Sequence, residues 1–238
     1  MVDLHCHILP GIDDGAKTTH DSVDLIQREI HDGVDMIAMT PHYYGHKRTI
    51  DEFIGQREKS YQTLAEELKR GNISIRIVLG AEVYFTPAFL KRPDKSSLCY
   101  RGTQYMLIEF PTEGYYDWIP NAIYQLGLER IVPVIAHIER YPFIQSKPER
   151  LNELVDAGAI IQTNAESLTH ILGRHKLLDS ISEGLIHLIA TDTHSINKRP
   201  PMLGKAMEVV RRKLGAQKAQ ELEANAYRIL ANKPGIGS

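Results

Sequence analysis

The sequence has few of the features that mark membrane, secreted or nucleic-acid-binding proteins. Its apolar runs fall short of the roughly 20 residues that a transmembrane helix needs, and its first ten residues lack the basic start and continuous apolar core of a signal peptide. We therefore expect a cytoplasmic protein that is not inserted in a membrane. Positive charge is not in excess, since 28 Lys and Arg face 30 Asp and Glu, which argues against a protein that holds nucleic acid through bulk charge.

Cysteines, linkers and repeats are also scarce. The two cysteines, Cys6 and Cys99, are expected to be reduced thiols rather than a disulfide in a protein without export signals. The 238 residues contain no low-complexity segment, no repeat and no linker rich in Pro, Gly or Ser. Because α/β barrels commonly close within about 200 to 250 residues, we predict a single domain spanning residues 1–238.

Short runs of β-forming residues alternate along the chain with longer amphipathic segments. The predicted strands are residues 2–5, 35–40, 74–83, 105–110, 131–137, 159–164 and 187–192. The predicted helices between them are residues 21–31, 51–70, 118–129, 148–157 and 174–183, and residues 204–231 follow as two helices whose outer faces are expected to be solvated. Strand and helix in alternation predict an α/β fold with parallel strands, either an open sheet or a closed barrel.

Polar side chains of one kind stand at the ends of these apolar strands. Six of the seven strands finish on or just before a histidine or acid. These residues are His5 and His7, His42, Glu82, Glu109, His137, and Asp192 with His194. The carboxyl ends of parallel strands meet at one face of the fold, where sites are built, and this placement favours the barrel.

The spacing and number of these groups indicate metal binding. His5 and His7 are two residues apart on an extended chain, so both side chains point the same way while Cys6 points the other way. Any single His or Asp is more often a core or cap residue, and Asp13-Asp14-Gly15 alone could be a turn. Burying all of them together without compensation would cost several kcal/mol each. Mixed imidazole and carboxylate groups suit Mn, Fe or Zn, and their number predicts two or three ions, with Glu82 bridging a pair.

Two arginines and a set of aromatic residues follow the same strands. Arg140 and Arg199 lie close beyond candidate ligands, and a guanidinium beside metals suits a phosphate oxyanion, so phosphate-ester hydrolysis is the leading chemistry. The alternative for each arginine is a surface ion pair. An aromatic rim could hold a flat substrate group or could simply pack the loops. Its members are Tyr43, Tyr44, Tyr84, Phe85, Tyr115, Tyr116, Trp118, Tyr141 and Phe143.

A cysteine nucleophile is excluded by spacing. A Cys-x5-Arg phosphate loop would need arginine at position 12 or 105, and the chain has Ile12 and Tyr105 there. We instead predict that hydroxide, formed from a water between two metals, attacks phosphorus in line.

The motifs at the strand ends resemble those of the polymerase and histidinol phosphatase (PHP) superfamily. They are His5-x-His7, Pro10-Gly-Ile-Asp-Asp-Gly15, Thr40-Pro-His42, Gly80-Ala-Glu82, Ile108-Glu109-Phe110, Ala136-His137-x-Glu-Arg140 and Thr191-Asp192-x-His194. Within it the chain is most similar to the bacterial manganese-dependent protein-tyrosine phosphatases of capsule and exopolysaccharide synthesis. The similarity covers nearly the whole chain. The chain departs from the pattern at Ile138, where some members have proline, and only partly matches the sixth-strand motif at residues 163–167.

The resemblance implies a distorted seven-stranded (β/α)7 barrel, Mn²⁺ as the cofactor and a defined role for each candidate. One ion would be held by His5, His7, Glu82 and Asp192, a second by Glu82, Glu109 and His137, and a third by Asp14, His42 and His194. Arg140 and Arg199 match residues that contact phosphate. The implied substrate and partner is a bacterial tyrosine kinase with phosphotyrosines on its C-terminal tail, which regulates capsular and exopolysaccharide synthesis.

Three alternatives stay open at the level of sequence. A small-molecule phosphatase, such as one for histidinol phosphate, would keep every ligand and differ only at the rim of the pocket. An amidohydrolase also begins with His-x-His but usually has a bridging lysine at the end of its fourth strand, where this chain has Glu109. A catalytically silent scaffold that binds a kinase would not need so complete a ligand set. Assembly into a homo-oligomer is also left open.

Overall fold

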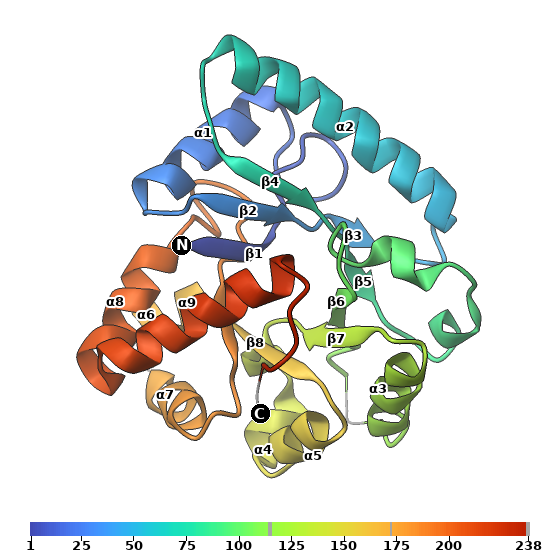
Figure 1. Cartoon of the computed structure of the whole chain (residues 1–238), viewed down its shortest axis with the longest axis vertical. Coiled ribbons are helices and arrows are strands. Elements are labelled where there is room, and N and C mark those ends of the chain that lie inside the picture. Colours follow the sequence, from blue (N-terminus) through green and yellow to red (C-terminus); the bar gives the residue numbers. More distant parts are fainter. Residues whose placement is uncertain (114–115, 172, 237–238) are drawn as a thin grey trace.

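A computed structural model describes residues 1–113, 116–171 and 173–236 (Figure 1). The strands are β1 (Val2–Cys6), β2 (Met36–Met39), β3 (His42–Tyr43), β4 (Arg76–Leu79), β5 (Glu82–Tyr84), β6 (Tyr105–Glu109), β7 (Val132–Ile135), β8 (Ile160–Asn164) and β9 (Leu188–Ala190). The helices are α1 (Thr19–His31), α2 (Ile50–Arg70), α3 (Ile119–Leu128), α4 (Pro142–Ser146), α5 (Arg150–Asp156), α6 (Ala165–Thr169), α7 (Arg174–Ser182), α8 (Leu203–Leu214) and α9 (Ala216–Leu230), with 3₁₀ helices η1 (Phe89–Lys91), η2 (Lys95–Leu98) and η3 (Ile138–Arg140).

The strands form two parallel sheets, in the orders β1-β2-β4 and β3-β5-β6-β7-β8-β9. The predicted mixed α/β fold with parallel strands is confirmed. The strand predicted at residues 35–40 is β2, and the two-residue strand β3 that follows Pro41 was not predicted. The strand predicted at residues 74–83 is wrong as a single element, because it spans β4, a break at Gly80 and the start of β5. Pro41 lacks a backbone N–H for the ladder, and the carbonyl of Gly80 accepts a hydrogen bond from buried Arg57 at 2.7 Å.

The two sheets meet where β1 and β9 end. The backbone N–H of Asp192 donates to the carbonyl of His5 at 2.7 Å, and that of His7 donates to the carbonyl of Thr193 at 2.8 Å. A single parallel bridge joins Cys6 to Thr193. The predicted closed cylinder of seven strands is therefore not confirmed, since the hydrogen-bonded strands divide into sets of three and six.

Helices surround the strands and bury their apolar faces against them (Figure 1). The C-terminal helices form as predicted, and each has a buried face as well as the expected solvated one. α8 and α9 pack on each other, and α9 also packs along β1 and β9 through Leu222, Ala226 and Ile229, which are buried. Among the described residues, no helix combines the length and apolarity needed to span a membrane.

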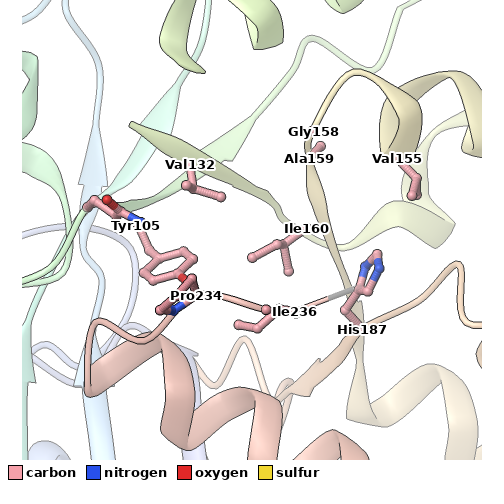
Figure 2. Close-up of a pocket in the computed structure, with 11 residues that line it drawn as sticks. Tyr105, Val132, Val155, Gly158, Ala159, Ile160, His187, Pro234 and Ile236 are labelled. Carbon is pink, nitrogen blue, oxygen red and sulfur yellow. The ribbon is translucent and has the colours of Figure 1, made fainter. Parts of the chain in front are cut away.

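A cavity of about 290 Å³ lies at the amino ends of the strands, away from the polar strand ends (Figure 2). It is lined by the first residues of β6, β7 and β8 and by the chain after α9, including Pro234 and Ile236. His187 on its wall is buried, and its Nδ1 accepts a hydrogen bond from the backbone N–H of Ile161 at 3.1 Å. Burial lowers the pKa of His187, although the charge of Glu221 opposes the shift.

Acid is expected to destabilise the fold through His187. Its pKa in the folded chain lies below the ordinary value of 6.5, so the unfolded chain binds the proton more readily. The stability that neutral His187 contributes is fully present above about pH 6.5 and is lost as the pH falls toward the folded pKa. Urea unfolding from about pH 8 to about pH 5 measures this. The His187→Gln variant should lose less stability over that range, and an identical pH dependence would contradict the assignment.

Candidate metal centre

The residues predicted at the strand ends come together at one face of the fold. The alternation of β1 places His5 and His7 on the same side, while the thiol of Cys6 points away and donates to the carbonyl of Ala38 at 3.4 Å. All nine predicted ligands lie within short range of at least one other candidate. They are His5, His7, Asp14, His42, Glu82, Glu109, His137, Asp192 and His194.

The first group of side chains surrounds a single point. The Nε2 atoms of His5 and His7 lie 3.2 Å apart. Each of them lies 3.2 to 3.4 Å from Oε2 of Glu82 and from Oδ1 of Asp192. Two atoms bound about 2.1 Å from one ion at right or tetrahedral angles are separated by about 3.0 to 3.4 Å, so these distances match the edges of a coordination polyhedron. These four residues are the set predicted for the first ion.

The second group is built around Glu82 and Glu109. Nε2 of His137 lies 2.8 Å from Oε1 of Glu82 and 3.6 Å from Oε2 of Glu109. On the other side of the two acids, Nδ1 of His42 lies 2.8 Å from Oε2 of Glu82 and 3.7 Å from Oε1 of Glu109. Glu82 therefore faces both this group and the first, as a bridging carboxylate would.

The third group places Asp14 between two imidazoles. Oδ1 of Asp14 lies 3.3 Å from Nε2 of His42 and 3.4 Å from Nε2 of His194. The ring of His7 stacks on that of His194 with centroids 3.9 Å apart, so this group is contiguous with the first. The geometry adds His7 to the predicted set of Asp14, His42 and His194.

Among the described residues, four buried ligand atoms of the cluster lie 2.8 to 3.4 Å from other ligand atoms but find no partner at hydrogen-bonding angles. They are Nδ1 of His42, Oε2 of Glu82, Oδ1 of Asp192 and Nε2 of His194. Leaving a buried polar atom unpaired costs about 1 to 3 kcal/mol, and more for a charged one. Several such atoms aimed into one space fit divalent cations, and the mix of nitrogen and oxygen donors suits Mn, Fe or Zn.

The charges of the cluster lead to the same conclusion. Five carboxylates, those of Asp13, Asp14, Glu82, Glu109 and Asp192, face two guanidinium groups. Burial opposes the charge of Glu82 and Asp192, but the charge of His5 and hydrogen bonds from neighbouring histidines outweigh it, so the pKa of each acid lies well below its usual range. Burial likewise opposes the charge of His42, but hydrogen bonds with Asp14 and Glu82 raise its pKa to about 9. Protonated imidazoles thus offset the negative charge of the carboxylates, and bound metal cations could offset it instead.

Three further polar residues hold the candidate ligands in position. Oδ2 of Asp13 lies 2.7 Å from Nδ1 of His7, so this acid of the predicted turn sits behind a ligand rather than among the ligands. On β8, Oε1 of Gln162 lies 3.2 Å from Nδ1 of His5 and accepts a hydrogen bond from the backbone N–H of His137 at 2.9 Å. Gln162 donates to Asn164, which in turn donates to Oδ2 of Asp192 at 3.1 Å.

Sequence reasoning missed Gln162 and Asn164. The sequence did contain a signal for them. Gln162 and Asn164 are two residues apart on β8, so both amides point to the same side of the sheet. Of the seven predicted strands, this is also the one that does not end at a candidate ligand.

Both predicted arginines reach the cluster. Nη2 of Arg140 lies 2.7 Å from Oδ2 of Asp192, and Nη1 of Arg199 lies 3.2 Å from the same oxygen. Nη2 of Arg199 also lies 3.4 Å from Oδ2 of Asp14. Glu139, the alternative partner for Arg140, instead accepts hydrogen bonds from Thr163, Asn164 and Ser167. The two guanidinium groups therefore converge on one carboxylate at the edge of the cluster.

The predicted aromatic rim divides into two sets. Tyr43, Phe85, Tyr141 and Phe143 are buried and pack the loops. The rings of Tyr44, Tyr84, Tyr116 and Trp118 are partly exposed, and Tyr115 lies outside the described residues. The ring of Tyr44 lies 5.3 Å from that of His42 and 5.6 Å from that of Tyr84, so two of the exposed rings stand beside the cluster.

Replacing Gly15 by alanine is expected to distort the cluster. A Cβ atom at Gly15 would lie 2.0 Å from the carbonyl oxygen of His7 and 2.5 Å from its Cβ, so the loop that carries Asp13 and Asp14 would have to move. We expect a loss of about 1 to 3 kcal/mol of stability together with weaker metal binding. Thermal unfolding and titration with Mn²⁺ measure both.

The matched control is Gly55→Ala in α2, where a new Cβ meets nothing within 4 Å. It should stabilise the helix by about 0.5 to 1 kcal/mol and leave metal binding unchanged. Equal behaviour of the two variants would show that the approach of Gly15 to His7 does not matter.

A parallel α/β fold with imidazoles, carboxylates and two arginines at its strand ends defines a metal-dependent hydrolase of phosphate esters. The particular family follows from sequence comparison: the chain belongs to the CpsB/CapC family of capsular polysaccharide synthesis, whose model matches residues 1–231. The predicted resemblance is thereby confirmed.

Individual proteins agree with the family. The chain is 31% identical to the tyrosine-protein phosphatase CpsB of Streptococcus agalactiae serotype V, over 98% of this chain and 99% of that protein. It is also 31% identical to the tyrosine-protein phosphatase YwqE of Bacillus subtilis, over 98% and 92%. A crystal structure from work on YwqE and Streptococcus pneumoniae CpsB, described as unique metal-dependent tyrosine phosphatases, superposes with a TM-score of 0.90 at 30% identity, covering 98% of this chain and 96% of that one.

Proposed function

We propose that this chain is a metal-dependent protein-tyrosine phosphatase that acts on phosphotyrosine of a bacterial tyrosine kinase in capsular or exopolysaccharide synthesis. The observation that carries the proposal is the cluster itself, in which unpaired nitrogen and oxygen atoms converge beside two guanidinium groups. The names of the similar proteins support the reaction and its metal dependence. The kinase tail as substrate, the cytoplasmic location and a homo-oligomer stay predictions.

The ligand assignment follows the three groups. His5, His7, Glu82 and Asp192 would hold one ion, Glu82, Glu109 and His137 a second, and Asp14, His42 and His194 a third, with His42 also adjacent to the second group. We propose Mn²⁺, with Fe or Zn as alternatives, because imidazole and carboxylate donors without thiolate suit these metals. When bound, such ions supply positive charge to phosphoryl oxygens and lower the pKa of water.

The chain's own residues supply binding and orientation. Arg140 and Arg199 are placed to receive the equatorial oxygens of a phosphoryl group, since planar guanidinium groups donate paired hydrogen bonds to such anions. Asp192 orients them through Oδ2 while its Oδ1 faces His5 and His7. Asp13 and Gln162 fix the rings of His7 and His5 through Nδ1, which leaves both Nε2 atoms directed at the centre.

Removing Gln162 is expected to weaken metal binding without unfolding the protein. The Gln162→Leu variant leaves Nδ1 of His5 and the N–H of His137 without their acceptor, and loss of such a supporting group typically costs 10- to 100-fold in metal affinity. Gln162→Glu, which keeps an acceptor, should restore most of the affinity. Titration of the metal-free protein with Mn²⁺ measures both, and Gln125→Leu on the exposed face of α3 is the matched control. Unaltered affinity in Gln162→Leu would refute the positioning role.

The deciding experiment is a substrate panel. The purified chain loaded with Mn²⁺ would be assayed against p-nitrophenyl phosphate, a phosphotyrosine peptide, histidinol phosphate and an amide. Hydrolysis of the peptide that a chelator abolishes is the expected result. A preference for histidinol phosphate by orders of magnitude would overturn the tyrosine phosphatase assignment and leave the metal centre standing.

We also propose that the two sheets are parts of one distorted seven-stranded barrel, which would make residues 1–238 one metallophosphatase domain. The hydrogen bonds between β1 and the end of β9 support this, because they link the outer strands of the two sheets. The succession of β2 by β3 and of β4 by β5 supports it as well, because each pair occupies one position of the predicted strand order.

A further inference from the structure

The loop between β3 and α2 places positive charge next to the candidate metal centre. Nζ of Lys47 lies 4.2 Å from the centroid of the Tyr44 ring, and that ring lies 5.3 Å from the ring of His42. Arg48 donates a hydrogen bond to the carbonyl of His42 at 3.5 Å. The Tyr44 ring therefore separates Lys47 from the candidate ligand His42, and Arg48 contacts the backbone of His42 directly.

A cavity of about 190 Å³ opens between this loop and the segment after β5. Tyr84 forms part of its wall and also packs on Tyr44, so the cavity adjoins the centre. The opposite wall includes Arg92, which donates hydrogen bonds to the hydroxyl of Tyr43 at 3.3 Å and to the carbonyl of Gly45.

The cations at and beside this cavity form no direct ion pair with the described residues of the chain. Within the part of the chain that the structure describes, no carboxylate oxygen lies within 4.0 Å of the charged nitrogens of Lys47, Arg48 or Arg92. The two arginines bond only to neutral acceptors here, the amide of Gln56 being one of them, and these leave their net charge in place. In a chain with a net charge of −2, Arg92 on the cavity wall, together with Lys47 and Arg48 in the loop whose Gly45 and His46 line the cavity, attracts an anion.

We propose that this cavity and the cations beside it form a subsite for a second anionic group, a carboxylate or a phosphate, that the substrate chain carries near its reacting phosphotyrosine. The inference rests on the proposed phosphatase function. An extended peptide advances about 3.3 to 3.6 Å per residue, so a side chain within about three residues of the phosphotyrosine reaches the subsite. The subsite favours phosphopeptides that carry this second anionic group, and it takes no part in the reaction at phosphorus, which occurs at the metal centre.

The test compares three phosphotyrosine peptides of equal length on the Mn²⁺-loaded full chain. One has neutral neighbours, one has glutamates, and one has 4-phosphonomethyl-phenylalanine, a phosphate analogue that cannot be hydrolysed. We expect kcat/KM for the charged peptides to exceed that for the neutral one by about three- to tenfold, through KM, and the preference to shrink as salt rises from about 0.05 M to about 0.5 M. The stronger of the two charged peptides identifies carboxylate or phosphate as the preferred anion.

Charge variants locate the preference. Lys47→Gln combined with Arg48→Gln should bring the ratio of kcat/KM between charged and neutral peptides closer to one, with Arg92 still contributing, and Lys47→Glu in place of Lys47→Gln should lower it further. The control Lys69→Gln removes one exposed positive charge from the far end of α2 and should keep the wild-type ratio. An equal loss of preference in Lys69→Gln would overturn the subsite, since overall charge would then explain the effect.

The other outcomes separate the two proposals. Equal kcat/KM of the wild-type chain for all three peptides would overturn the subsite and leave the phosphatase standing. Failure to hydrolyse any of the three, with p-nitrophenyl phosphate still turned over, would overturn both the peptide substrate and the subsite.

Discussion

Replacing His7 by alanine should reduce phosphatase activity by on the order of a thousandfold or more. Nε2 of His7 lies 3.2 Å from that of His5, 3.2 Å from Glu82 and 3.4 Å from Asp192, and its ring also stacks on His194, so its removal opens two of the three groups at once. The expected loss appears in kcat at saturating substrate and in the metal content of the purified protein. Retention of both metal and activity would contradict the assigned centre.

The neighbouring residue provides the matched control. Cys6 is buried on the opposite side of β1, and burial raises the pKa of its thiol well above the ordinary value, which makes a thiolate nucleophile unfavourable. Burial also raises the pKa of Cys99 to about 12. A variant with both Cys6→Ala and Cys99→Ala should keep its metal and nearly all of its activity. Loss of turnover in this variant, with folding intact, would reopen the cysteine route.

Removing either arginine should lower kcat/KM by about 10²- to 10³-fold, because each guanidinium group supplies donors that strengthen as charge develops on the phosphoryl oxygens. Arg140→Lys should recover only part of the loss, since an ammonium group cannot donate in the paired geometry of a guanidinium. Steady-state kinetics on a phosphotyrosine peptide measure both effects.

The double variant tests whether the two arginines act together. Both contact Oδ2 of Asp192, at 2.7 and 3.2 Å, so we expect the combined loss from Arg140→Ala and Arg199→Ala to be smaller than the product of the single losses. Arg211→Ala, which removes an exposed arginine paired with Glu208 on α8, should change nothing. Strict multiplication of the single effects would show independent roles.

The elements of the fold could be predicted from sequence because apolar periodicity is a local property. The helix predicted at residues 51–70 is Ile50–Arg70, with Thr49 as its N-cap, and the strand predicted at 105–110 is Tyr105–Glu109. The short strand β3 after Pro41 and the break between β4 and β5 at Gly80 were not predicted. They depend on where neighbouring strands end and on the contact of Arg57 with Gly80, which join residues that are distant in sequence.

The ligand candidates were predictable because the ends of parallel strands converge whatever the details of the sheet. The supporting residues were not, since an amide such as Gln162 carries no charge or spacing that distinguishes it from an ordinary strand residue. Two further features depend on tertiary context. His137 and Asp192 have backbone φ angles of +36° and +54°, in the left-handed region that non-glycine residues rarely adopt, and packing around the cluster must hold them there.

The two oxygens of Asp192 face different partners, Oδ1 the candidate ligands His5 and His7 and Oδ2 the two arginines, so binding of an ion and binding of an anion would be linked through this carboxylate. If a phosphoryl group drew the arginines away from Oδ2, the carboxylate would lose positive neighbours and would hold a cation at Oδ1 more strongly. Reciprocity would then require the cation held with Asp192, His5 and His7 to increase the affinity for phosphate by the same factor. Removal of that ion would thus also weaken the binding of phosphate.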